Sequence, residues 1–132
     1  MRLNLQLLST TPAAVQRPSY DPSTLGVGIV HLGIGAFHRA HQAVYTDAAM
    51  ALAGGDWGIC GVSFKSVTVR DQLATQDGLY SVRSVSQAGN AWRVIGSVRE
   101  VLFAPQQMAE VIARIARAET KIVSLTVTEK GY

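Results

Sequence analysis

The chain has 132 residues, of which 48% are hydrophobic and 16% charged, so it is not a disordered chain and can form one sizeable core. Its net charge of +3 comes from 12 Lys and Arg against 9 Asp and Glu, and these basic residues are scattered rather than interleaved with aromatic ones, which argues against nucleic-acid binding. A single cysteine excludes a disulfide within the chain and favours the reducing cytoplasm, and no apolar run reaches the length of a signal-peptide core or a membrane span.

The first 25 residues carry three of the four prolines and are predicted to form an extended N-terminal arm, with a separate domain over residues 26–132. The stretch "VGIVHL" (27–32) is apolar and β-branched, which predicts a buried parallel strand. Apolar residues at steps of three and four then predict a helix that the Gly54-Gly55 pair ends. The apolar face of that helix consists of Phe37, Ala40, Val44, Ala48 and Leu52.

The middle of the chain predicts a strand, a helix and a hairpin. A second apolar run, 57–64, predicts another strand, and Ser66 is a suitable cap for a short helix through Leu73. The runs 79–86 and 91–98 flank "QAGN" and predict a β-hairpin inserted between the αβ units.

The last third predicts one more αβ unit. "EVLFA" (100–104) is a candidate strand, Pro105 opens a helix, and "IVSLTV" (122–127) predicts a last buried strand. The predicted apolar stripe of the helix consists of Met108, Val111, Ile112, Ile115 and Ala116. The order β-α-β-α-hairpin-β-α-β predicts an α/β fold with a mainly parallel sheet and helices on its faces.

Gly33 and Gly35 directly follow the first predicted strand and precede the first predicted helix. In such a turn the first glycine adopts backbone angles closed to other residues, and the second lets a pyrophosphate approach the main chain. The helix would then present free N–H groups and the positive end of its dipole to that pyrophosphate. A third glycine would fall at residue 38, where the chain has His, so a plain tight turn remains an alternative.

Three histidines, His31, His38 and His41, lie near this turn. His38 and His41 have the spacing of metal ligands on one helix, but no carboxylate accompanies them at helical spacing and Cys60 belongs to another strand, so we expect no metal site. We interpret His31 and His41 as packing residues. His38 and Arg39 fall in the first helical turn, where a cation would lie at the positive end of the helix dipole. Their placement there favours the binding of an anion at the same position.

The end of the second strand bears on the choice of cofactor, because NAD sites usually have an acidic residue there for the ribose hydroxyls. Here the strand ends in "VSFKS", and Asp56 precedes the strand, at the wrong edge of the sheet. Lys65 is either a solvated loop charge or, if it faces the site, a group that favours an adenosine 2′-phosphate. The sequence thus predicts weakened discrimination against NADP.

Five longer stretches resemble one known family. "IVHLGIGAFHRAHQAVYTD", "DWGICGV", "QDGLYSV", "RVIGSVREVL" and "KIVSLTVTEKGY" together resemble the N-terminal domain of the mannitol dehydrogenase family, which includes mannitol 2-dehydrogenase and fructuronate reductase. The resemblance runs from about Arg17 to Tyr132 and implies a Rossmann-like, doubly wound α/β domain. It also implies metal-independent hydride transfer between NAD(P) and C2 of an acyclic polyol or sugar acid, either mannitol/fructose or mannonate/fructuronate.

The resemblance places the glycine turn at the cofactor. The implied cofactor-binding residues are Gly33, Ile34, Gly35, Ala36, Phe37, His38, Arg39 and Thr128, the last near the nicotinamide, and the strand-end argument adds Lys65. No catalytic residue is expected in this chain, because the family's general-base lysine and the Asn and His that polarise the carbonyl belong to a larger helical C-terminal domain, and Lys130 lies outside that motif. We therefore expect an incomplete N-terminal part of a two-domain cytoplasmic enzyme. The alternative is a stand-alone nucleotide-sensing or partner-binding module.

Overall fold

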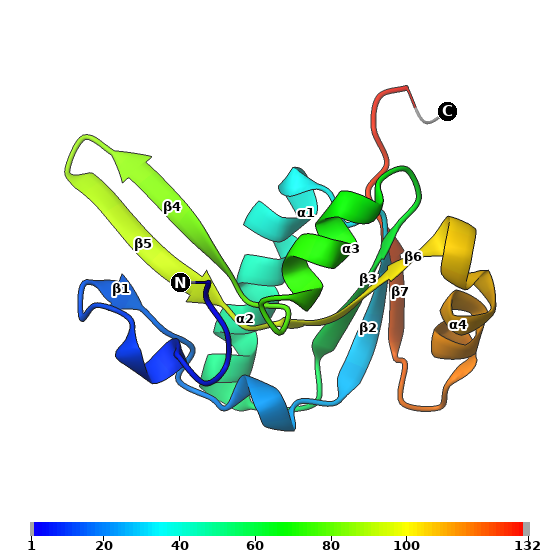
Figure 1. The fold of residues 1–132 in the computed structure, drawn as a ribbon, viewed down its shortest axis with the longest axis horizontal. Coiled ribbons are helices and arrows are strands. Elements are labelled where there is room, and N and C mark those ends of the chain that lie inside the picture. Colours follow the sequence, from blue (N-terminus) through cyan, green and yellow to red (C-terminus); the bar gives the residue numbers. More distant parts are fainter. Residues whose placement is uncertain (1, 131–132) are drawn as a thin grey trace.

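The computed structural model describes residues 2–130, and its centre is a four-stranded parallel sheet in the order β6-β3-β2-β7 (Figure 1). The strands are β2 (Val27–Leu32), β3 (Gly58–Ser63), β6 (Val98–Phe103) and β7 (Ile122–Leu125). One face is covered by α1 (Ala36–Ala40), α2 (Gln42–Ala53) and α3 (Val67–Ala74), and the other by α4 (Ala104–Ala116). The predicted α/β class with a mainly parallel sheet is confirmed.

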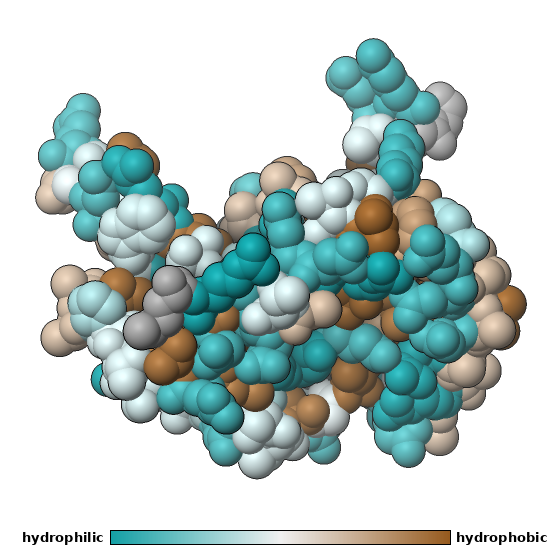
Figure 2. Space-filling view, in the orientation of Figure 1, coloured by the Kyte–Doolittle hydropathy of each residue, from teal (hydrophilic) through white to brown (hydrophobic). Residues whose placement is uncertain are grey.

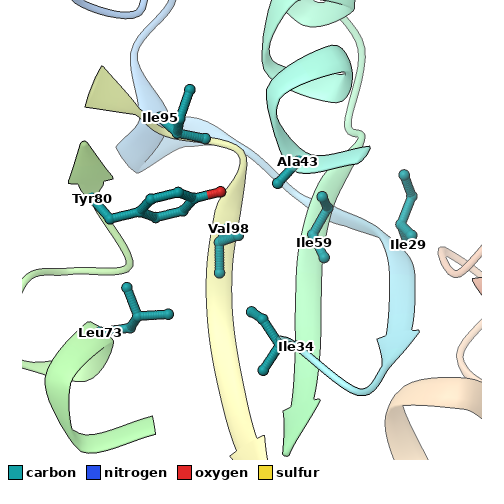
Figure 3. Close-up of a cluster of buried hydrophobic side chains, with 8 residues drawn as sticks. All are labelled: Ile29, Ile34, Ala43, Ile59, Leu73, Tyr80, Ile95 and Val98. Atoms are coloured by element: carbon teal, nitrogen blue, oxygen red, sulfur yellow. The ribbon is translucent and has the colours of Figure 1, made fainter. Parts of the chain in front are cut away.

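The core lies on both faces of this sheet because successive strand residues point in opposite directions. Ile29 belongs to the cluster on the α1–α3 face, where Leu73 and Tyr80 also pack (Figure 3). Its neighbour Val30 belongs to the cluster on the other face, together with Val111 of α4. The continuous apolar run of β2 is therefore explained by burial on both sides.

The predicted inserted hairpin is confirmed and projects beyond the four-stranded sheet (Figure 1). It consists of β4 (Tyr80–Ser86) and β5 (Gly89–Ile95). Ser86 pairs with Gly89, so the turn is two residues long, shorter than the predicted four. Gly89 permits this reversal because its φ of +119° is accessible to glycine.

The N-terminal arm is packed against the hairpin and is not simply extended, so that expectation is wrong. The arm contains two 3₁₀ helices, η1 (Leu8–Thr10) and η2 (Pro22–Thr24), and the short strand β1 (Val15–Gln16). Val15 pairs in parallel with Trp92, which makes the hairpin a three-stranded sheet in the order β1-β5-β4. The arm folds back because β5 offers it a free strand edge.

The first predicted helix is broken at His41 into α1 and α2. The backbone of His41 has φ −122° and ψ −86°, and its N–H bonds to the carbonyl of His38, three residues back. Its ring Nδ1 lies 2.8 Å from the carbonyl of Phe37, the group that would otherwise accept the helical N–H of His41. The imidazole thus replaces one helical hydrogen bond and ends α1.

The last strand, β7, ends two residues before the predicted boundary and is largely exposed, so the expectation of a buried strand is wrong. It lies at the edge of the sheet, with β2 as its strand neighbour, while α4 packs over β3 and β6. Because α4 packs over β3 and β6 and not over β7, only part of its predicted apolar stripe is covered. Val111 is buried, whereas Met108, Ile112 and Ile115 are exposed.

The hairpin tip and the segment after β7 rise on either side of the carboxyl edge of the sheet, with α1 between them (Figure 1). In the space-filling view both projections are mainly hydrophilic (Figure 2). Within residues 2–130, none of the helices has the length and apolarity to cross a membrane.

Candidate functional site

The turn between β2 and α1 lies at the carboxyl edge of the sheet. Gly33 has φ +100°, which strongly favours glycine, and its N–H donates to the carbonyl of Val62 at 2.7 Å. Gly35 has φ −86° and ψ −177°, an extended backbone that any residue adopts. A Cβ added at either glycine would meet no atom within 4 Å. Backbone geometry therefore explains Gly33, whereas at Gly35 the outer face of the turn is simply open to an approaching group.

Ile34, between these glycines, faces the core. Its side chain is buried and packs over Gly61 of β3, where any larger residue would collide with it. Its N–H donates to the carbonyl of Val62 at 3.2 Å. Ile34 therefore anchors the turn, and its side chain and amide are both engaged within the protein.

Ala36 and Phe37 begin α1 and are exposed. The Phe37 ring stacks on His41 with ring centroids 4.2 Å apart. His41 is exposed as well, so it packs on the surface against Phe37 and not in the core. The backbone N–H groups at the start of a helix lack helical partners and are available to an anion on this side.

His38 points inward and is only 2% exposed. Its ring stacks on His31 of β2, with centroids 3.7 Å apart and planes 13° apart, and its Nδ1 lies 3.1 Å from Oε1 of Gln42. Burial, and then the neighbouring His31, lower the pKa of His38 to about 4. His38 is therefore neutral near pH 7, and the expectation that it places a cation in the first helical turn is wrong.

A partly buried hydrogen-bond network, which the sequence reasoning missed, joins this histidine pair to β7. His31 Nδ1 lies 2.9 Å from Oγ of Ser124, the residue opposite it in the strand register. The Ser124 hydroxyl also contacts the amide of Gln42 at 3.3 Å. The four-residue spacing of His38 and Gln42 could have predicted their contact, because residues four apart are neighbours on a helix surface. Within residues 2–130, no group of three or more His, Cys, Asp or Glu side chains could hold a metal ion.

Arg39 is the remaining residue of the predicted turn. It is partly buried, and its Nε donates to the carbonyl of Gly35 at 3.4 Å. Its own carbonyl accepts a hydrogen bond of 2.6 Å from the hydroxyl of Tyr80. Arg39 is thus held at the end of α1 by the glycine turn and by the hairpin.

Lys65 and Thr128 are exposed and follow β3 and β7, the two strands that flank β2. Because the three strands are parallel, both residues lie at the same edge of the sheet as Gly33. The chain runs from β2 to β3 and β6 on one side and returns to β7 on the other, so the strand order reverses at β2. Ligands of open α/β sheets bind at such a reversal.

The opposite, amino edge of the sheet holds other features. Asp56 lies there, as expected, and accepts a hydrogen bond of 2.9 Å from the N–H of Gly26. A hollow of about 750 Å³, lined in part by Trp57 and Lys121, also opens at this edge. Cys60 lies not at this edge but within β3, where burial raises the pKa of its thiol to about 12 and keeps it protonated. None of these groups faces the glycine turn.

Comparison with known proteins gives consistent matches. Residues 27–132 match the family model described as the mannitol dehydrogenase Rossmann domain. A mannitol 2-dehydrogenase from Pyricularia oryzae is 48% identical over 125 residues, which cover 92% of this chain and 25% of that protein.

Two solved structures are similar over the whole chain. One is a Pseudomonas fluorescens mannitol 2-dehydrogenase in a ternary complex with NAD and D-mannitol, with a TM-score of 0.93 and 43% identity. The other is a substrate-free D-sorbitol dehydrogenase, with a TM-score of 0.91 and 36% identity. All of this chain is covered in both cases, and it spans 28% of each of those chains.

Proposed function

Because the chain belongs to the mannitol dehydrogenase Rossmann-domain family, we propose that it binds NAD at the turn of Gly33 and Gly35. The observation that carries the proposal is the open outer face of this turn at the point where the strand order reverses. On this proposal the pyrophosphate lies against Gly35 and the amides of Ala36 and Phe37. The adenosine lies toward Lys65, and the nicotinamide toward Thr128.

We propose further that the whole protein is an NAD-dependent polyol oxidoreductase. When bound, NAD would supply the hydride acceptor for C2 of an acyclic polyol such as mannitol, while an acid–base group takes the hydroxyl proton, so that a ketose is formed. Residues 2–130 hold the cofactor, and the acid–base group is supplied from outside them. The names of the relatives support the polyol, and the mannonate/fructuronate pair is the competing substrate class.

The proposal is tested in two steps with the full protein. NADH is first titrated into the protein and its fluorescence followed, which reports cofactor binding independently of turnover. NADH oxidation is then measured with fructose and with fructuronate as alternative acceptors. Faster turnover of fructose supports the polyol, and faster turnover of fructuronate reassigns the substrate to sugar acids. Tight NADH binding with no turnover of either would favour the nucleotide-sensing module.

The choice between NAD and NADP is tested at Lys65. The loop after β3 lacks a carboxylate that would bind the ribose hydroxyls and repel a 2′-phosphate, so we propose that NADP is tolerated beside NAD. Lys65→Asp should raise the ratio of kcat/KM for NAD over NADP several-fold, because it replaces an attraction with a repulsion. Lys121→Asp, at the amino edge, is the matched charge change and should leave the ratio unmoved. An unchanged ratio in Lys65→Asp would show that Lys65 is only a solvated loop charge.

A further inference from the structure

Helix α1 carries the residues that the proposed function assigns to the pyrophosphate, yet it is only five residues long. It is separated from α2 by the non-helical backbone of His41. So short a helix has almost no stability of its own. Its position must therefore be fixed by contacts with the rest of the protein.

One such contact comes from the inserted hairpin. Tyr80 is the first residue of β4, and its ring is buried in the core cluster that includes Ala43 of α2 and Leu73 of α3 (Figure 3). Its hydroxyl donates a hydrogen bond of 2.6 Å to the carbonyl of Arg39, in the last turn of α1. Burial raises the pKa of Tyr80, so the hydroxyl stays protonated and remains a donor.

A second contact is the stack of His38 on His31, which ties α1 to β2. Both rings are buried, and the Gln42 and Ser124 side chains hydrogen bond to them. The two contacts hold α1 from different sides, one from the hairpin and one from the central sheet. Helix α2 has anchors of its own, among them the Ser97 hydroxyl, which donates to the carbonyl of Ala43 at 2.7 Å.

We propose that Tyr80 is a positioning residue for cofactor binding: through the carbonyl of Arg39 it fixes α1, and with it Gly35 and Phe37. This inference rests on the proposed function for its cofactor, and it gives the inserted hairpin a role at a site that its own strands do not form. Tyr80 does not touch the cofactor in this assignment. Its effect is transmitted through the placement of α1.

The test compares Tyr80→Phe with Ser97→Ala in the full chain. Each substitution removes one buried hydroxyl that donates to a backbone carbonyl, of α1 in the first case and of α2 in the second. Both variants should lose similar stability to urea. Tyr80→Phe should weaken NADH binding about fivefold to tenfold, the effect of one lost hydrogen bond on the geometry of the site, and Ser97→Ala by less than about twofold. Equal NADH affinities in the two variants, whether both reduced or both unchanged, would overturn the proposal.

Hydrogen exchange without cofactor provides a second readout that does not depend on the proposed function. The amides of Arg39 and His41, which donate to the carbonyls of Gly35 and His38, should exchange faster in Tyr80→Phe than in the unmodified chain, while the hydrogen-bonded amides of α2 from Tyr45 onward remain unchanged. Ser97→Ala should show no acceleration at Arg39 and His41. If the α1 and α2 amides always exchange together, the proposal fails. If the unmodified chain does not bind NADH but the exchange pattern is found, the proposed function fails and the role of Tyr80 in placing α1 stands.

Discussion

Gly33 and Gly35 are two residues apart but have different physical reasons for being glycine. Gly35→Val should leave the free energy of unfolding within about 0.5 kcal/mol, because its backbone is extended and its Cβ would meet no atom. It should nevertheless weaken NADH binding by more than about tenfold, since under the proposed function the side chain would occupy the space of the pyrophosphate. The NADH titration and urea unfolding check the two parts separately.

Gly33→Val is the matched substitution. It should cost about 1–3 kcal/mol of stability, because valine is strained at φ +100° even though the space around it is open. A folded Gly35→Val variant with unchanged NADH affinity would show that the pyrophosphate does not bind at this turn. A Gly33→Val variant as stable as the unmodified chain would contradict the prediction that valine is strained at this backbone conformation.

The buried pair of histidines predicts a pH-dependent stability. His38 has a pKa near 6.5 when unfolded and about 4 when folded, so between these values the unfolded chain binds more protons. The free energy of unfolding should therefore fall as the pH is lowered from 6.5 toward 4, by at most about 3 kcal/mol from His38. His31, whose pKa is also lowered by burial, adds in the same direction.

His38→Phe provides the measurement for this prediction. The variant keeps a flat ring against His31 and removes the titrating group. Urea unfolding at several pH values should show a shallower fall in stability on the acid side than in the unmodified chain, because the carboxylates titrate alike in both proteins. Identical slopes would mean that His38 is solvated enough to be protonated in the folded chain.

The difference between Gly33 and His38 shows what a single sequence reveals about a site. Gly33 was predicted because a strand, a turn and a helix follow one another along the chain, and local spacing is sufficient to place it. The burial of His38 was not predicted, because it depends on the break at His41 and on Ser124, which lies 86 positions away in the sequence and pairs with His31 only through the sheet register. Lys65 and Thr128 remain predictions as cofactor contacts.

The elements themselves are linked by a buried ion pair that the sequence did not reveal. Asp47 in α2 is only 1% exposed, and its carboxylate accepts hydrogen bonds from Arg93 of β5 at 2.6 Å, from the N–H of Gly96 at 2.9 Å and from the hydroxyl of Tyr20. It thereby joins the N-terminal arm, α2 and the hairpin. Asp47→Asn should lower the free energy of unfolding by about 3 kcal/mol, because Arg93 then loses its charged partner in a largely buried site.

Glu100→Gln is the control for this prediction. Glu100 pairs with Arg114 at 2.7 Å, but about a quarter to a third of each side chain is exposed, so the loss should stay below about 1 kcal/mol. Urea unfolding of the two variants gives the comparison. Equal losses would show that the Asp47 cluster adds no more than a surface ion pair.

Element type was predictable from the sequence where one local pattern decides it. The Ser66 cap and α3 are confirmed, and the Ser66 hydroxyl accepts a hydrogen bond from the N–H of Thr68 at 3.2 Å. The hairpin is also confirmed, and it was predictable because two strand-like runs flank a short turn segment. The folded-back arm was missed, since its strand forms only against β5, and the break at His41 was missed because the intervening imidazole leaves the apolar spacing unchanged.

At the scale of the whole molecule, the distribution of apolar surface is uneven. Val123 and Leu125 of β7 are the register partners of Val30 and Leu32 in β2, but both are exposed because α4 packs over β3 and β6. Ile112 of α4 is also exposed. Strands of parallel sheets are normally buried on both faces, and an exposed apolar edge strand is a template for pairing with another chain. The 132-residue chain studied alone should therefore self-associate through β7.

Leu125→Lys tests this directly, because Leu125 is 59% exposed on the edge strand and a charge there opposes edge pairing. Light scattering after size exclusion should show oligomers of the unmodified 132-residue chain at about 100 µM and a shift toward monomer in Leu125→Lys. Leu52→Lys is the control: Leu52 is 90% exposed on α2, away from β7, so its substitution removes an equally apolar group without touching the edge. A monomeric unmodified chain would contradict the predicted self-association. An equal shift in both variants would show that surface apolarity in general, and not the free edge of β7, governs association.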